Sequence, residues 1–231
     1  MSRVVCDITI SADGYSAGLN QTEERPFGDD GGDGGDGSGA QLHAWMFETP
    51  DENRAEVDRM AAPAAFIMGR NMFGPVRGAW DRPWNGWWGD DPPFHAPVFV
   101  LTHHAREPQP MAGGTTYHFV TDGIDAALAQ ARAAAGDGEV AVQGGATTAN
   151  QYLAAGLVDE LRLHVAPFTM GASTRMFDGV PPLRLAQVTA RGASLVTHLT
   201  YRVLAPTRTT AATAIWTSSA TARTSARSDR R

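Results

Sequence analysis

Residues 139–165, EVAVQGGATTANQYLAAGLVDELRLHV, place a short apolar strand, two glycines and a helix in immediate succession. The run 139–143 has the composition of a buried strand, and Gly144 and Gly145 follow it directly. Thr147 or Thr148 is a suitable first residue for the helix, and Gly156 ends it. A strand that runs straight into a helix is typical of parallel α/β sheets, so this stretch predicts the fold class.

The rest of the chain extends the same alternation. Further runs with strand character precede and follow it, at residues 3–10, 64–69, 97–102, 115–121, 160–168 and 195–204. Thr49-Pro50-Asp51-Glu52 has the signals of a helix start, and Asp122 and Gly136 bound another helix. We therefore predict one α/β domain over residues 1–205, with a mixed, mostly parallel sheet and antiparallel strands at its C-terminal end.

Two segments fall outside this domain pattern. Residues 27–40 are rich in glycine and aspartate and predict a flexible surface loop. Residues 206–231 are biased to Thr, Ala, Ser and Arg, and predict a disordered tail.

Composition excludes several classes of function. The net charge is −6, which disfavours nucleic acid and anionic membranes as partners. All 19 basic residues are arginine, so a P-loop lysine and a Schiff-base lysine are both excluded. Cys6 is the single cysteine, and no metal-ligand motif is present, so we predict no disulfide and no metal. We expect a cytoplasmic protein that acts on a small molecule.

Three strand ends carry residues suited to anions. Gly144-Gly145 before a helix start suits a phosphate, although on spacing alone a tight turn with ordinary capping is the favoured explanation of the pair. Gly69-Arg70-Asn71 and Thr102-His103-His104 end two other predicted strands. For the histidines, metal binding is the rival interpretation, but no carboxylate partner is evident. Taken together, the three ends favour a dinucleotide lying across the edge of the sheet.

Four motifs in this order resemble the dihydrofolate reductase-like superfamily. They are ISADGYSAG at 10–18, IMGRNMFG at 67–74, VFVLTHH at 98–104, and the long stretch 142–179 that ends in MFDG. The likeness is greatest to bacterial proteins similar to the C-terminal reductase domain of the bifunctional riboflavin-biosynthesis enzyme. This resemblance implies a dihydrofolate reductase-like three-layer fold, NADPH as the cofactor, and a homodimer.

The resemblance also implies roles for individual residues in holding NADPH. Ala12 and the loop as far as Gly18 match the segment that covers the nicotinamide. The family segment that holds the cofactor's phosphates matches Gly69, Arg70, Asn71 and Met72. The turn beside the adenosine ribose matches Thr102, His103 and His104. Gly144 and Gly145 match the family's glycine pair, whose peptide bond is often cis. The residues that bind the pyrophosphate match Ala146, Thr147 and Thr148.

The sequence signals for substrate-binding and catalytic residues are less specific than those for the cofactor. Asp90 and Asp91 stand where the riboflavin-pathway reductase has an Asp-Asp-Pro, which makes Asp91 the candidate catalytic proton donor. Candidate substrate-binding residues are Asp7, Trp45, Trp80 and Asp90, although a proline-rich surface turn explains the acidic pair equally well. The expected activity is hydride transfer to a ribosylamino-pyrimidine of riboflavin synthesis. A pterin or folate reductase and a non-catalytic nucleotide-binding module are the alternatives.

Overall fold

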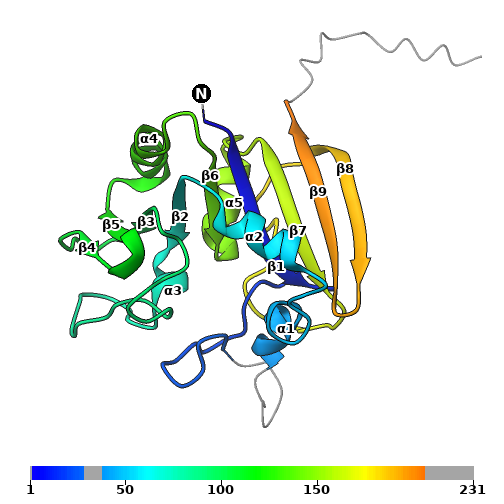
Figure 1. Ribbon diagram of the computed structural model, residues 1–231, viewed down its shortest axis with the longest axis horizontal. Helices are drawn as coiled ribbons and strands as arrows, with labels where there is room; N and C mark the ends of the chain where they lie inside the picture. The colour runs from blue at the N-terminus through cyan, green and yellow to red at the C-terminus, as the bar shows by residue number, and fades with distance from the viewer. Residues whose placement is uncertain (1, 29–37, 206–231) are drawn as a thin grey trace, which may run out of the picture.

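The computed structural model describes residues 2–28 and 38–205. Within them a nine-stranded sheet runs in the order β4-β5-β3-β2-β6-β1-β7-β9-β8 (Figure 1). Its strands are β1 (Val4–Ser11), β2 (Ala65–Gly69), β3 (Pro97–Leu101), β4 (Gln109–Pro110), β5 (Thr116–Val120), β6 (Val140–Gly144), β7 (Glu160–Ala166), β8 (Arg184–Ala193) and β9 (Val196–Leu204). Most of the loop predicted over 27–40, and the tail predicted from 206, lie outside the described residues.

The central strands are parallel, as the alternation of strands and helices predicts. Parallel pairing links β5 to β3, β3 to β2, β2 to β6, β6 to β1 and β1 to β7. Antiparallel pairing adds β4 at one edge and the β8–β9 hairpin at the other. The mixed sheet and the antiparallel C-terminal hairpin are therefore confirmed, although β8 was not among the predicted strand ranges.

Both faces of β1 are buried, and the two faces differ in chemistry. Val4, Cys6, Ile8 and Ile10 pack into an apolar cluster with residues of α4 (Gly123–Ala135) and α5 (Ala146–Ala154). The opposite face carries Asp7 and Thr9 beside a second cluster of aromatic and aliphatic residues. A strand covered on both faces is what a parallel sheet requires, and the helices form the outer layers.

The three predicted helices differ in how closely their starts agree with the structure. Asp122 and Gly136 flank α4 as predicted, and α5 begins at Ala146, one residue before the earlier of the two predicted starts. The helix predicted from Thr49 is wrong by several residues, because α2 (Arg54–Ala61) begins only after Asn53. The Asn53 amide donates to the carbonyl oxygens of Trp45 and Thr49, at 3.1 and 2.9 Å, and so holds the preceding residues in turns.

The remaining short elements are η1 (Ser38–His43), α1 (Ala44–Phe47), α3 (Arg70–Phe73) and η2 (Ala112–Gly114). The pair η1 and α1 places His43 and Trp45 over the polar face of β1 and β7. Helix α3 follows β2 with no intervening loop, so Arg70 lies directly at the end of a central strand.

Candidate active site

A large cavity of about 920 Å³ opens at the carboxyl ends of the parallel strands. Its walls come from the ends of β2, β3, β5 and β6, from the middle of β1, and from the first residues of α5. In open parallel sheets ligands bind at this edge. The volume is at the upper end of the range of about 300–1,000 Å³ that is usual for ligand pockets.

One side of the cavity is organised by Arg70. Its Nη1 donates to Thr102 Oγ1 at 2.9 Å, and its guanidinium lies 3.4 Å above the centroid of the Trp80 ring. Its Nη2 is buried without a hydrogen-bond partner among the described residues. A guanidinium held on two sides with an unsatisfied donor on the third is suited to bind an anion.

Two other arginines lie near Arg70, and among the described residues no carboxylate lies within contact distance of any of the three. Burial lowers the pKa of Arg70, the charges of Arg77 and Arg106 lower it further, and the charge of Asp81 opposes them with the smallest effect. In the part of the chain that the structure describes, no ion pair within 4 Å involves any of these three arginines. A bound anion would relieve this repulsion, so a phosphate fits the site electrostatically.

The glycine pair forms the neighbouring wall. The Gly144–Gly145 peptide bond is cis, and Gly144 has a φ of +109°, a conformation that favours glycine. A Cβ on Gly69 would stand 2.3 Å from Thr148 Oγ1, so any side chain there would displace the Thr148 hydroxyl where β2 passes the start of α5. A Cβ on Gly145 would meet nothing within 4 Å, which leaves the backbone there open to a ligand.

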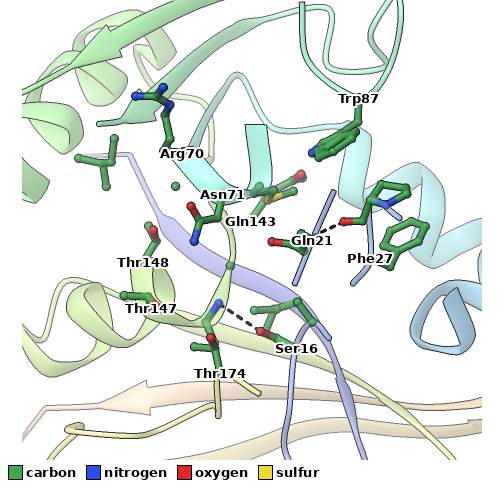
Figure 2. A pocket seen from close by; sticks show the side chains of 18 of the residues that line it. Ser16, Gln21, Phe27, Arg70, Asn71, Trp87, Gln143, Thr147, Thr148 and Thr174 are labelled. Atoms are coloured by element: carbon green, nitrogen blue, oxygen red, sulfur yellow. Dashed lines mark hydrogen bonds between the residues drawn. The ribbon is translucent and has the colours of Figure 1, made fainter. Parts of the chain in front are cut away.

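The first turn of α5 completes this wall. The Ala146 amide donates to Ser16 Oγ at 3.2 Å, which ties the loop after β1 to the helix start (Figure 2). Figure 2 also shows Arg70, Asn71, Thr147 and Thr148 together on one side of the cavity, with Phe27 and Trp87 on the other. We call residues 69–72, 102–104 and 145–148 the Arg70 side.

The opposite wall contains buried polar atoms and aromatic rings. Asp7, Thr9 and His43 line the cavity, and we call these three residues the Asp7 side. Asp7 Oδ2, Thr9 Oγ1 and His43 Nδ1 are buried without a hydrogen-bond partner among the described residues. The His43 ring stacks on Phe27 at 4.7 Å, and burial and the nearby His164 lower the pKa of His43 to about 4. A planar, polar substrate fits between these groups.

The loop after β1 is anchored at its base. Asp13 accepts hydrogen bonds from Ser11 Oγ and from the backbone amides of Met170 and Gly171. Slight burial opposes the effect, but these bonds lower the pKa of Asp13 to about 2. The anchored loop carries Ser16, Gly18 and Gln21 into the cavity wall.

The structure brings most of the sequence-predicted residues to one cavity. Those that line it are Asp7, Gly18, Gly69, Arg70, Asn71, Met72, Thr102, His103, His104, Gly145, Ala146, Thr147 and Thr148. Ala12 and Gly144 do not line it: the Ala12 amide donates to Phe168 O, and Gly144 faces Ile8.

The acidic pair does not reach the cavity. Asp90 and Asp91 are exposed on an outer loop, where the Asp91 side chain lies 3.8 Å from His95 and the Asp90 carbonyl accepts from Ala112. A solvated carboxylate there has no apolar surroundings to keep its proton. The structure therefore gives no support to Asp91 as proton donor or to Asp90 as a substrate ligand.

The two tryptophans predicted to bind substrate have other surroundings. Trp45 is fully buried against the rings of His164 and His198, at 4.9 and 5.0 Å. Trp80 lies beneath Arg70 and donates to the carbonyl of His104, on the Arg70 side. Both support other side chains and neither lines the cavity.

Sequence reasoning missed His43 and Thr9. His43 stands in a segment with no recognisable motif, and only the fold over the sheet brings it to the wall. Thr9 had a signal, since it follows Asp7 with the period of two that places both side chains on one strand face.

The fold is that of a dihydrofolate reductase-like α/β protein. The family model of the RibD C-terminal domain matches residues 2–197, so the chain belongs to that family, which is a family of reductase domains. A comparison with the curated proteins gives no significant match.

Solved structures agree on the fold. A protein assigned to riboflavin biosynthesis from Shewanella sp. PV-4 is 22% identical with a TM-score of 0.57, covering 89% of this chain and 100% of that one. Acinetobacter baumannii RibD is 16% identical with a TM-score of 0.55, and this chain spans 59% of its length. The Thermotoga maritima diaminohydroxyphosphoribosylaminopyrimidine deaminase/5-amino-6-(5-phosphoribosylamino)uracil reductase is 15% identical with a TM-score of 0.51. That match covers 88% of this chain and 57% of the Thermotoga protein.

Across residues 2–28 and 38–205, none of the helices has the length and apolar character that a bilayer-crossing segment needs.

Proposed function

We propose that this protein is an NADPH-dependent reductase that delivers hydride to an electrophilic carbon of a small heterocyclic substrate. The observation that carries the proposal is Arg70, whose buried Nη2 has no hydrogen-bond partner in the described part of the chain and which lines the same cavity as the open backbone of Gly145 and the start of α5. A dinucleotide with an additional phosphate matches this arrangement of donors.

The chain's own residues would hold and orient the cofactor. Arg70, with Thr102, His103 and His104, would bind the 2′-phosphate and the adenosine ribose. Gly145 to Thr148 would bind the pyrophosphate, with Gly144 as the turn before them. Ala12 and the loop to Gly18 would cover the nicotinamide. NADPH supplies the hydride, and the protein supplies orientation and the exclusion of water.

The substrate class follows from the Asp7 side and from family membership. Asp7 Oδ2 and Thr9 Oγ1 have no hydrogen-bond partner within residues 2–28 and 38–205, and the rings of Phe27, Trp87 and Phe94 line the same cavity. A flat heterocycle with polar edges fits such a wall. Because the chain belongs to the RibD C-terminal family, the substrate we favour resembles 5-amino-6-(5-phosphoribosylamino)uracil, reduced at a C=N or C=O group of its sugar-derived arm.

The test begins with the cofactor. Tryptophan fluorescence is titrated with NADPH and separately with NADH, and we expect micromolar or tighter binding of NADPH with at least about tenfold preference. Equal binding would remove the 2′-phosphate site, and no binding of either cofactor would overturn the reductase and leave a non-catalytic module.

The second stage follows NADPH consumption with two probes. Turnover of 5-amino-6-(5-phosphoribosylamino)uracil supports the favoured substrate class. Turnover of dihydrofolate alone supports the folate alternative. The homodimer and the cytoplasmic location stay predictions, and light scattering coupled to gel filtration measures the first.

A further inference from the structure

One polar side chain of the cavity, that of Gln143, belongs to neither the Arg70 side nor the Asp7 side. Gln143 lies on β6 directly before the glycine pair, and it lines the cavity. Figure 2 shows it between Asn71, on the Arg70 side, and Gln21 from the loop after β1. Gln143 therefore stands between the residues proposed to hold the cofactor and the rest of the cavity.

The parallel pairing of β6 with β2 is irregular at Gln143. Ile67 pairs with Val142. The next residue of β2, Met68, pairs with Gly144, so Gln143 has no counterpart on β2. An extra residue of this kind redirects a side chain, and such bulges are frequent next to active sites. The irregularity thus coincides with a polar side chain in the cavity wall.

A hydrogen bond fixes which way the Gln143 amide faces. Its Nε2 lies 3.0 Å from the carbonyl oxygen of Met60, on α2. A carbonyl oxygen only accepts, so the amide atom next to it must be the nitrogen, and the other atom is the oxygen Oε1. In the described part of the chain no group donates to Oε1, and this atom is not enclosed by protein. Gln143 therefore presents a hydrogen-bond acceptor to the cavity.

The surroundings of this acceptor favour an uncharged ring over an anion. Helix α2, which holds the amide, contributes apolar side chains to the cavity wall, namely Val57, Met60 and Ala61. On the other neighbouring strand, Cys6 of β1 pairs with Val142, and Asp7 follows this pair as Gln143 does on β6. Oxygen atoms on two adjacent strands repel a phosphate and attract an N–H group.

We propose that Gln143 determines substrate specificity by accepting a hydrogen bond from a ring N–H group of the heterocycle. The inference rests on the proposed reductase function and deepens it. A uracil ring carries such N–H groups, each next to a carbonyl group. A ring that is methylated at its nitrogens leaves Oε1 without a partner, so the complex loses that hydrogen bond. Gln143 takes part in binding and in no covalent step.

The first test measures binding without turnover. The full chain is saturated with NADP⁺ and titrated in a calorimeter with 5-amino-6-(5-phosphoribosylamino)uracil, and separately with the analogue methylated at both ring nitrogens. The unaltered protein should bind the N–H compound at least about tenfold more tightly, and Gln143→Met should reduce this preference to less than about threefold. Equal binding by the unaltered protein, no binding of either compound, or a preference retained in Gln143→Met would overturn the inference.

A second variant separates the acceptor from the contact with α2. Gln143→Glu keeps an oxygen acceptor of the same reach but cannot donate to the carbonyl oxygen of Met60. It should keep at least about a fivefold preference for the N–H compound. If the Glu and Met variants behave alike, Gln143 serves only to hold α2, and its role in specificity is wrong.

The matched control is Gln109→Met, on β4. Gln109 does not line the cavity, and the exchange removes a 2.8 Å hydrogen bond to Asn85 Oδ1. This variant should keep the preference of the unaltered protein. A preference lost in the control as well would show that the effect is not specific to Gln143.

Kinetics and cofactor binding distinguish this inference from the proposed function. With 5-amino-6-(5-phosphoribosylamino)uracil as substrate, Gln143→Met should raise KM about tenfold and change kcat by less than about threefold. The NADPH dissociation constant should change by less than about twofold. An equal rise in that constant would place the amide on the cofactor and overturn the substrate role. Failure of the unaltered protein to bind NADPH would overturn the reductase function instead, and the same titrations without cofactor would still test Gln143.

Discussion

The two sides of the cavity are built by different means. The Arg70 side consists of three short segments, each at the end of a parallel strand, and the backbone at Gly145 is open to the cavity. The Asp7 side gathers β1 and the η1 helix, and its support comes from β7, β9 and the turn at Asn53. The Arg70 side is therefore built from short strand-end segments, whereas the buried polar network behind the Asp7 side requires distant segments to enclose it.

The largest expected effect tests how far burial governs the Asp7 side. Arg162→Leu leaves Glu139 and Glu160 without their buried partner, and should lower the free energy of unfolding by about 3–5 kcal/mol. Arg3 contacts the same two carboxylates, but its side chain is 54% exposed. Arg3→Leu should therefore cost less than about 1 kcal/mol. Urea denaturation of both variants measures the difference, and equal losses would contradict the argument from burial.

The second prediction concerns pH and His43. Its pKa is about 4 in the folded protein and 6.5 in the reference state, so the unfolded chain binds more protons between these values. His43 therefore contributes stability above pH 6.5, and the contribution is lost as pH falls toward 4. The loss is of order 3 kcal/mol at most. Measurement of the free energy of unfolding from pH 7 to pH 4 tests this prediction. The free energy of unfolding of His43→Gln should fall less steeply over that range. Parallel curves for the two proteins would show that His43 does not contribute.

The third prediction concerns a variant that changes the Arg70 side alone. Arg70→Ala removes the guanidinium next to Thr102, and should raise the NADPH dissociation constant about 10- to 100-fold. NADH lacks the 2′-phosphate, so its dissociation constant should change by less than about threefold. Arg82→Ala, which breaks an exposed pair with Glu23, is the control. Equal weakening of both cofactors would mean that Arg70 does not bind the 2′-phosphate.

The smallest effect is expected outside both sides. Asp91→Ala removes an exposed carboxylate 3.8 Å from His95, and should change stability by less than about 0.5 kcal/mol. The rate of NADPH consumption, with whichever of the two probe substrates the unaltered protein reduces, should stay within about twofold of the unaltered protein's rate. A large loss of turnover would return Asp91 to the role that the sequence suggested.

Local sequence patterns predicted the elements well where one segment determines its own structure. Residues 139–165 fold as a strand, a glycine turn, a helix and a strand, as their composition indicates. Asp122 and Gly136 flank their helix for the same reason. The helix start at Thr49 was misplaced because the side chain of Asn53, rather than the capping pattern, holds that turn.

The chain's sequence by itself determined the parallel sheet and the Arg70 side, because a glycine turn and a helix start create backbone donors within a few residues. Only the tertiary structure decided the Asp7 side. The hydrogen bonds of Asp7, His164, His198 and Asn53 join residues far apart in the chain. Each of these buried polar atoms needs a hydrogen-bond partner, and the partner comes from a distant part of the chain, so no pattern along the sequence records that constraint.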